Sequence, residues 1–279
     1  AGRGGAAGET ASGRFWVEAL GAQGRQSAHA DVGGYRSVAG GLAFGVETDV
    51  SGRDLVGFSG AYTRARANGS AQANGDDLRV DGYHLGAYFS RVDEALTLDA
   101  SVLAAYSSYD SRRRVTFPGF TADLRGDYHG KGVSGRFEAG FPFALAAGWS
   151  GRWLVGARAA YLATDAYTEK GNAAAALRVR DGSAASLQSV LGLSLSRQLS
   201  AADQFNLALR YLHEFADTPE IKASLNNGGP VFRIDEIKPK RDALQLGFAY
   251  RRIVGDGVSV AIGYDGEFKS DYRLHQLTA

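Results

Sequence analysis

Cysteine and methionine are absent from this chain of 279 residues, and proline occurs only five times. Without cysteine the chain cannot form a disulfide framework, a thiolate metal site, an iron–sulfur cluster or a thiol nucleophile. No apolar run approaches the ~18 residues of a membrane-spanning helix; the stretch from Phe143 to Trp149 is among the longest. Basic and acidic residues nearly balance, 31 against 30, so the net charge of +1 gives no general reason to expect a nucleic-acid partner.

The chain also lacks a recognisable export signal, because it begins with Ala1 and residues 1–13 contain no basic stretch followed by an apolar one. We expect it to be part of a longer precursor or of an engineered form of one. Glycine, by contrast, is abundant at 38 residues, about twice its usual share. No Gly-X-Y repeat accompanies the glycine, which excludes collagen, and an apolar content of 44% excludes a disordered chain.

Hydrophobic residues recur with a period of two rather than 3.6. Leu98, Val102 and Tyr106 would lie on one face of a strand, and Asp99 and Ser101 on the other. Each such segment is predicted to be a β-strand with one apolar face and one face of small, polar or charged residues. Twelve segments follow the pattern, and they begin near Phe15, Val38, Val56, Tyr83, Leu96, Val133, Trp153, Leu187, Phe205, Leu244, Val258 and Tyr272.

The connections between these segments alternate between short and long. The short ones are 49–54, 92–95, 146–151, 199–204 and 254–258, and the long polar ones are 21–34, 66–79, 107–129, 166–186 and 214–241. Transmembrane β-barrels have this asymmetry, with short periplasmic turns and longer extracellular loops, whereas a soluble sandwich has no reason to sort its turns by parity. We therefore predict an all-β fold: a 12-stranded antiparallel transmembrane β-barrel of the bacterial outer membrane.

Tyrosines support this prediction, because several of them end the apolar face of a strand as it approaches a long loop, where barrels carry an aromatic girdle. They are Tyr106, Tyr161, Tyr211, Tyr250 and Tyr264. If the apolar face meets lipid, the opposite face lines a lumen. We predict that the lumen is lined by His84, Asp99, Arg136, Glu138, Arg158, Arg210, Glu214, Arg251, Asp265 and Glu267.

Glycine and alanine occupy most other inward positions, which favours an open or plugged passage over a packed interior. Large side chains at these glycines would block a narrow passage. The feature expected to carry function is therefore a narrow polar conduit. Charges such as those of Arg136 with Glu138, and of Arg210 with Glu214, either stabilise the wall or line a transport path.

No motif predicts an enzyme, a cofactor or a bound metal. None of the five histidines has a second histidine four positions on or a serine two positions on, and no Gly-x-Ser-x-Gly elbow occurs. The run Arg112–Arg114 is typical of a nucleic-acid or lipopolysaccharide patch, but the acidic residues near it favour a solvated loop. Asp99, Glu138 and Glu267 are candidate acids for a peptide self-cleavage near Ala1.

Six stretches resemble the translocator (β) domain of classical autotransporters, most of all its Bordetella branch. They are Phe15–Gly21, Gly82–Tyr88, Tyr109–Val115, Arg210–Phe215, Arg241–Gly247 and Gly263–Asp271, and they follow the order of the family across nearly the whole chain. The resemblance implies a type V secretion barrel that exports its N-terminal passenger polypeptide to the cell surface. It also implies the barrel-assembly machinery, outer-membrane lipid and lipopolysaccharide as partners, with no nucleic acid.

The resemblance further implies that residues 1–13 are a residual linker in or near the lumen and that residues 14–279 form the barrel. Two departures matter. The chain stops at Leu277-Thr-Ala279, before the aromatic residue that normally ends the family's last strand, so closure of strand twelve on strand one is in doubt. No asparagine precedes Ala1, so an asparagine-dependent self-cleavage cannot be inferred.

Two alternative functions stay open. A porin-like passive channel would move small solutes through the same lumen. A surface adhesin would act through the loops 107–129 and 214–241.

Overall fold

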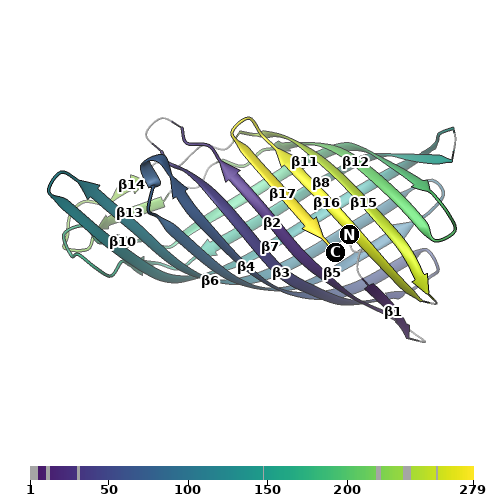
Figure 1. Ribbon diagram of the computed structural model, residues 1–279, viewed down its shortest axis with the longest axis horizontal. Helices are drawn as coiled ribbons and strands as arrows, with labels where there is room; N and C mark the ends of the chain where they lie inside the picture. The colour runs from purple at the N-terminus through teal and green to yellow at the C-terminus, as the bar shows by residue number, and fades with distance from the viewer. Residues whose placement is uncertain are drawn as a thin grey trace.

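The computed structural model describes residues 6–10, 13–29, 32–146, 148–217, 221–234, 240–255 and 257–279. Twelve strands form one closed antiparallel barrel, which confirms the predicted fold (Figure 1). They are β2 (Gly13–Gln26), β3 (Gly34–Asp49), β4 (Asp54–Ser70), β5 (Asp77–Val92), β6 (Thr97–Phe117), β7 (Phe120–Ala144), β8 (Trp149–Thr164), β11 (Gly182–Gln198), β12 (Asp203–Glu214), β15 (Asp242–Gly255), β16 (Val258–Phe268) and β17 (Tyr272–Thr278). In the described ranges the one helical element, η1 (Ala71–Ala73), is a single 3₁₀ turn, and no helix there is long and apolar enough to cross a membrane.

Each barrel strand pairs with its neighbours in the sequence, and the ring closes between β17 and β2. This closure resolves the doubt raised by the early end of the chain: the register runs from Tyr272 opposite Gln26 to Thr278 opposite Leu20. Below that point β2 pairs instead with β1 (Ala6–Thr10), which forms a hairpin with it and reaches Ser259 of β16. Residues 6–10 of the expected linker therefore run along the wall, while residues 1–5 and 11–12 lie outside the described residues.

The apolar surface of the barrel faces outward. Leu85, Phe58 and Trp153 are 73%, 62% and 59% exposed, as expected for side chains that would contact lipid rather than a protein core. Tyr106, Tyr161, Tyr211 and Tyr264 lie at the long-loop end, as predicted. Tyr250 does not, because β15 runs the other way and places this ring beside the short turn, where its hydroxyl donates to Asp203 (2.5 Å).

The expected loops 21–34, 66–79 and 107–129 are shorter than predicted, because the strands continue beyond the membrane. β6 and β7 form one hairpin from Thr97 to Ala144 with Pro118 and Gly119 at its tip, where Gly119 has a φ of +81°. Outside the membrane both faces of a strand meet water, so the hydropathy alternation fades although the hydrogen-bonded ladder persists. Pairs of opposite charge lie across this part of the ladder, such as Arg112 with Asp123 at 2.9 Å.

The remaining long connections, 166–186 and 214–241, contain a separate four-stranded sheet at the extracellular end (Figure 1). Its strands are β9 (Tyr167–Thr168), β10 (Leu177–Val179), β13 (Ile221–Leu225) and β14 (Phe232–Ile234), packed around Leu177, Val179 and Ala223. Glu169 holds this sheet to the barrel. Its carboxylate accepts two hydrogen bonds from Arg113 of β6, at 2.9 and 2.6 Å, and one from the Leu177 amide at 2.8 Å.

Candidate functional site in the lumen

The centre of the lumen holds a cluster of charged residues around Glu138 of β7. Its carboxylate accepts hydrogen bonds from Nη2 of Arg136 (3.1 Å) and from Nε and Nη2 of Arg210 (2.8 and 3.1 Å). Arg210 lies on β12, so its side chain passes β8 and β11 to reach Glu138. Only 5% of Glu138 is exposed. The alternation of the strands thus brings three of the predicted residues into direct contact.

A second link extends the cluster towards β15 and β16. Arg158 of β8 donates from Nη2 to the side-chain oxygen of Gln245 (2.7 Å), again across two intervening strands. Asp265 of β16 lies in register with Gly247 of β15, and it interacts electrostatically with Arg158 and with Arg210. Within the described residues, the Nε atoms of Arg136 and Arg158 are buried and make no hydrogen bond. The cluster is thus a site with spare donor capacity.

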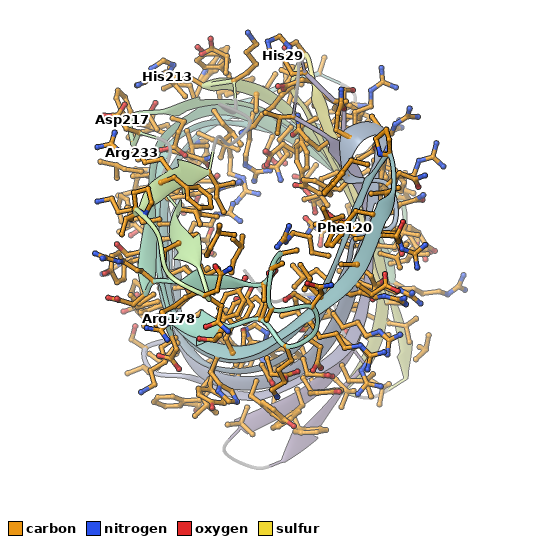
Figure 2. All side chains as sticks on the ribbon, turned by 90° about the vertical axis from the view of Figure 1, so that its left-hand side faces the viewer. His29, Phe120, Arg178, His213, Asp217 and Arg233 are labelled. Atoms are coloured by element: carbon orange, nitrogen blue, oxygen red, sulfur yellow. The ribbon has the colours of Figure 1, made fainter. Side chains whose placement is uncertain are left out.

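Two cavities lie on either side of this cluster, and both are lined by Arg136 and Tyr88. The one towards the extracellular end measures 480 Å³ and is also lined by Arg158. The one towards the short turns measures 560 Å³ and is also lined by Glu138 and Arg210. The charged cluster therefore forms a constriction in a polar interior. Figure 2 views the barrel from the end that carries Phe120 and Arg178 and shows side chains lining its inner wall.

The other predicted lumenal residues have side-chain partners of their own, although Asp99 stands opposite Glu138 in the sheet and Glu267 stands opposite Gln245. His84 shares a hydrogen bond with Thr63 (3.0 Å), and Asp99 accepts one from Ser90 (2.8 Å). At the upper rim Glu214 accepts hydrogen bonds from the side chains of Ser186 and Gln188 and from the Leu187 amide. Arg251 donates to Ser259 (3.2 Å), and Glu267 lies 3.9 Å from Lys269. The ten residues thus do not form one site.

A buried network near β2 was missed by the prediction. Trp16 donates from Nε1 to the Tyr88 hydroxyl (2.7 Å), which in turn donates to Glu47 (2.9 Å), and Arg14 donates to the other oxygen of Glu47 (3.1 Å). Glycines make room for the rings: a Cβ at Gly57 would overlap Tyr88. Glycine at such a position therefore leaves space for a neighbouring aromatic ring to lie against the barrel wall. The signal in the sequence that could have pointed to this network was the alternation of inward Glu47 with outward Val46.

Three stacked tyrosines lie at the extracellular end of the barrel. Tyr128 lies between Tyr109 and Tyr167, with ring centroids at 4.8 and 4.4 Å and planes within 8° of parallel. Burial raises the pKa of the Tyr128 hydroxyl, and the neighbouring tyrosines add to this effect. Above the membrane the hydrogen bonds that Arg113 donates to the Glu169 carboxylate raise the pKa of Arg113. The Tyr128 hydroxyl therefore stays neutral and Arg113 stays cationic, so these contacts persist across the physiological pH range.

In the described part of the chain, no group of three or more His, Asp or Glu side chains is arranged to hold a metal ion. His213 is paired with Asp242 (Nδ1 to Oδ1, 2.8 Å), and both side chains are partly or largely exposed on the outer face.

Comparison with known proteins places the barrel among secretion domains. The family model "Autotransporter beta-domain" matches residues 15–265. The chain is 24% identical over 275 residues to an extracellular serine protease of Serratia marcescens, covering 95% of this chain and 25% of that protein. It is 25% identical over 202 residues to the esterase EstA of Pseudomonas aeruginosa, covering 70% of this chain and 31% of the esterase. The chain thus spans about a quarter to a third of the length of these relatives.

Solved structures agree on the fold. The translocator domain of autotransporter NalP from Neisseria meningitidis matches with a TM-score of 0.78 and 14% identity, covering 97% of this chain and 87% of that one. The β domain of the Bordetella autotransporter BrkA matches with a TM-score of 0.66 and 19% identity, covering 96% and 98%. With the match of the family to most of the chain, these findings confirm the resemblance seen in the sequence: the chain belongs to the autotransporter β-domain family, the outer-membrane translocator barrels of type V secretion.

Proposed function

We propose that this barrel exports a passenger polypeptide, attached at its N-terminal side, through the lumen described above. The observation that carries the proposal is the charged constriction between two lumenal cavities. Positive guanidinium groups and negative carboxylates can hydrate a passing backbone, while the Glu138 carboxylate, fixed between its two arginines, is not free to grip it. The barrel wall stays rigid during export, because the backbone groups of its strands are hydrogen-bonded to the neighbouring strands.

We further propose that residues 1–13 are the residual linker and pass in or near the lumen before β2. The hairpin of β1 with β2 keeps residues 6–10 in the wall between β2 and β16, so the proposed lumenal path concerns residues 1–5. The barrel-assembly machinery and outer-membrane lipid are the expected partners for insertion. The protease and esterase activities in the names of the relatives belong to proteins three to four times longer than the matched region, and we propose that this domain itself is not an enzyme.

Cross-linking tests the path of the linker. The chain has no cysteine, so each introduced pair is free of background. A cysteine at Gly4 is combined with one at Ser101, which lines the upper lumenal cavity, or with one at Val102, the next residue, which is 51% exposed on the outer face. We expect a disulfide with S101C and none with V102C. Equal cross-linking at both positions, or none at Ser101, would contradict a lumenal linker.

Conductance separates export from passive permeation. In planar bilayers, the chain without residues 1–13 should conduct far more than the complete chain if the linker fills the lumen. Equal, large and steady conductance from both would favour the porin-like channel.

A further inference from the structure

The outer face of the barrel carries a band of basic residues directly above its apolar belt. The band, here called the basic face, consists of Arg273 on β17, Arg25 on β2, Arg36 on β3, Arg64 and Arg66 on β4, Arg79 on β5, Arg112 and Arg114 on β6, and Arg125 and Lys131 on β7. Pairing in the sheet places many of them in one row. Arg273, Arg25 and Arg36 lie opposite one another in turn, and the same row continues through the neutral Asn68 of β4 and the acidic Asp77 of β5 to Arg112 and Arg125.

The depth of the basic face is set by tyrosines. Tyr62, Tyr83 and Tyr106 lie in register across β4, β5 and β6 and mark the upper edge of the apolar belt. Arg64 and Arg66 follow Tyr62 on the same face, two and four positions further along the strand. At ~3.3 Å per residue, Arg66 lies about 13 Å beyond the tyrosine along the strand, and less in height because barrel strands tilt. The guanidinium groups of Arg64 and Arg66 therefore stand at the level of lipid headgroups, whereas Arg112, Arg114 and Arg125 lie further out, about 20–26 Å along the strand from the tyrosine row.

The basic face occupies one half of the barrel. On β8, β11, β12, β15 and β16 the outward positions just above the belt carry small, neutral or acidic residues. They include Ala163, Ala185, His213, Asp242 and Gly266. Two basic residues lie close by on this half, Lys240 and Arg241, which directly precede β15. A general need for solubility would place charge on all sides of the barrel, so the asymmetry points to a ligand on one side.

The basic face is hollowed. Adjoining cavities of 710 and 560 Å³ are both lined by Arg66 and Arg79, and the larger is also lined by Arg112, Arg114 and Arg125. The side chains of Arg66 and Arg79 are 51% and 60% exposed, so they reach solvent rather than a protein core.

Carboxylates offset only part of this charge. Asp77 is shared by Arg66 and Arg79 at 2.6 and 3.4 Å, and Asp123 is shared by Arg112 and Arg114 at 2.9 and 2.8 Å. The acidic residues among the basic ones are Asp76, Asp77, Asp81, Asp110, Asp123 and Asp127, six against the ten basic residues. Exposed ion pairs of this kind add little to stability, so their pairing alone does not account for the excess of guanidinium groups.

We propose that the basic face binds the phosphate groups of the glycolipid that forms the outer leaflet of the outer membrane. Three features select this occupant: Arg64 and Arg66 stand at headgroup depth, the basic face continues directly from the lipid-facing belt, and arginine offers a planar pair of donors that matches a phosphate. Bound lipid would fix the rotation of the barrel about its axis, with the basic half embedded in glycolipid. The proposal depends on the outer-membrane location but not on passenger export.

A titration of the folded protein in detergent micelles tests the proposal. The probes are lipopolysaccharide with a short inner core, the same lipid after enzymatic dephosphorylation, and inorganic phosphate. The variant Arg66→Gln/Arg79→Gln/Arg125→Gln removes three charges from the hollow. The matched control, Arg53→Gln/Arg91→Gln/Arg252→Gln, removes three exposed arginines that also form ion pairs, but at the short-turn end. Heat-modifiable migration on a gel checks that each variant is folded.

We expect the first variant to bind the phosphorylated lipid about 100-fold more weakly, since each of the three basic groups near an anionic surface contributes about fivefold. The control should stay within about threefold of the wild type, and dephosphorylation should weaken wild-type binding as much as the first variant does. Equal affinity of all three proteins, or an equal loss in both variants, would overturn the proposal. Undiminished binding of dephosphorylated lipid by the wild type would overturn it even if no variant folded. Displacement by inorganic phosphate at the concentrations at which lipid binds would show a general anion site and refute the lipid assignment.

Discussion

Replacing Glu138 with glutamine should destabilise the barrel, although the shape of the side chain is preserved. The carboxylate accepts three charge-assisted hydrogen bonds from two guanidinium groups, and it is nearly inaccessible to solvent. Removing one partner of a buried pair costs about 3–5 kcal/mol, and the cavities on either side of this cluster lower that figure because they admit water. We therefore expect E138Q to lose about 2–3 kcal/mol of unfolding free energy.

The matched control is Asp99→Asn, an inward carboxylate whose described side-chain partner is the Ser90 hydroxyl at 2.8 Å. We expect it to lose about 1 kcal/mol or less. Urea unfolding in detergent micelles, followed by the fluorescence of the three tryptophans, measures both variants. A double-mutant cycle with Arg210→Gln should then show a coupling energy of about 1–2 kcal/mol between Glu138 and Arg210. If E138Q and R210Q each lay within about 0.5 kcal/mol of the wild type and were additive, the cluster would have no structural role.

Three further outcomes follow from the same structure. Gly57→Ala should cost about 1–3 kcal/mol in the same urea assay, because the added methyl group overlaps the ring of Tyr88; a neutral result would mean that this ring can move aside. Glu169→Gln should release the segment 165–181 and speed its cleavage by added protease about tenfold, whereas unchanged cleavage would show that other contacts hold it. The guanidinium groups nearest Asp123 lower the pKa of its carboxyl to about 2, so the ion pair is intact above the unfolded pKa near 4 and is lost as the pH falls through about 2. In an NMR titration the midpoint of Asp123 should rise in Arg114→Gln, and an unmoved midpoint would contradict this assignment.

The strands, their number and the inward or outward face of most side chains could be predicted from alternation and loop parity, because both follow from a wall one residue thick between lipid and water. The contact of Glu138 with Arg210 could not, because it depends on the stagger between strands that are three apart in the sheet. The length of the β6–β7 hairpin was underestimated, because polar residues on both faces hide the period of two. The four short strands above the barrel were missed for a simpler reason: two to five residues give too few alternations to recognise.

The order of the strands has a consequence for how the chain folds. Every contact between neighbouring barrel strands except one joins segments that follow one another in the sequence, so eleven hairpin pairings can form locally and early. The exception, Tyr272 with Gln26, joins residues almost the full length of the chain apart. The loop-closure entropy that opposes this pairing grows with loop length, so it is larger than for any of the hairpins. Ring closure should therefore be the last and slowest event, with a rate that is sensitive to changes in β17 and indifferent to most changes in the middle of the wall. An open, curved sheet with two unpaired edges is the expected species just before that step, and during it the chain is most exposed to aggregation.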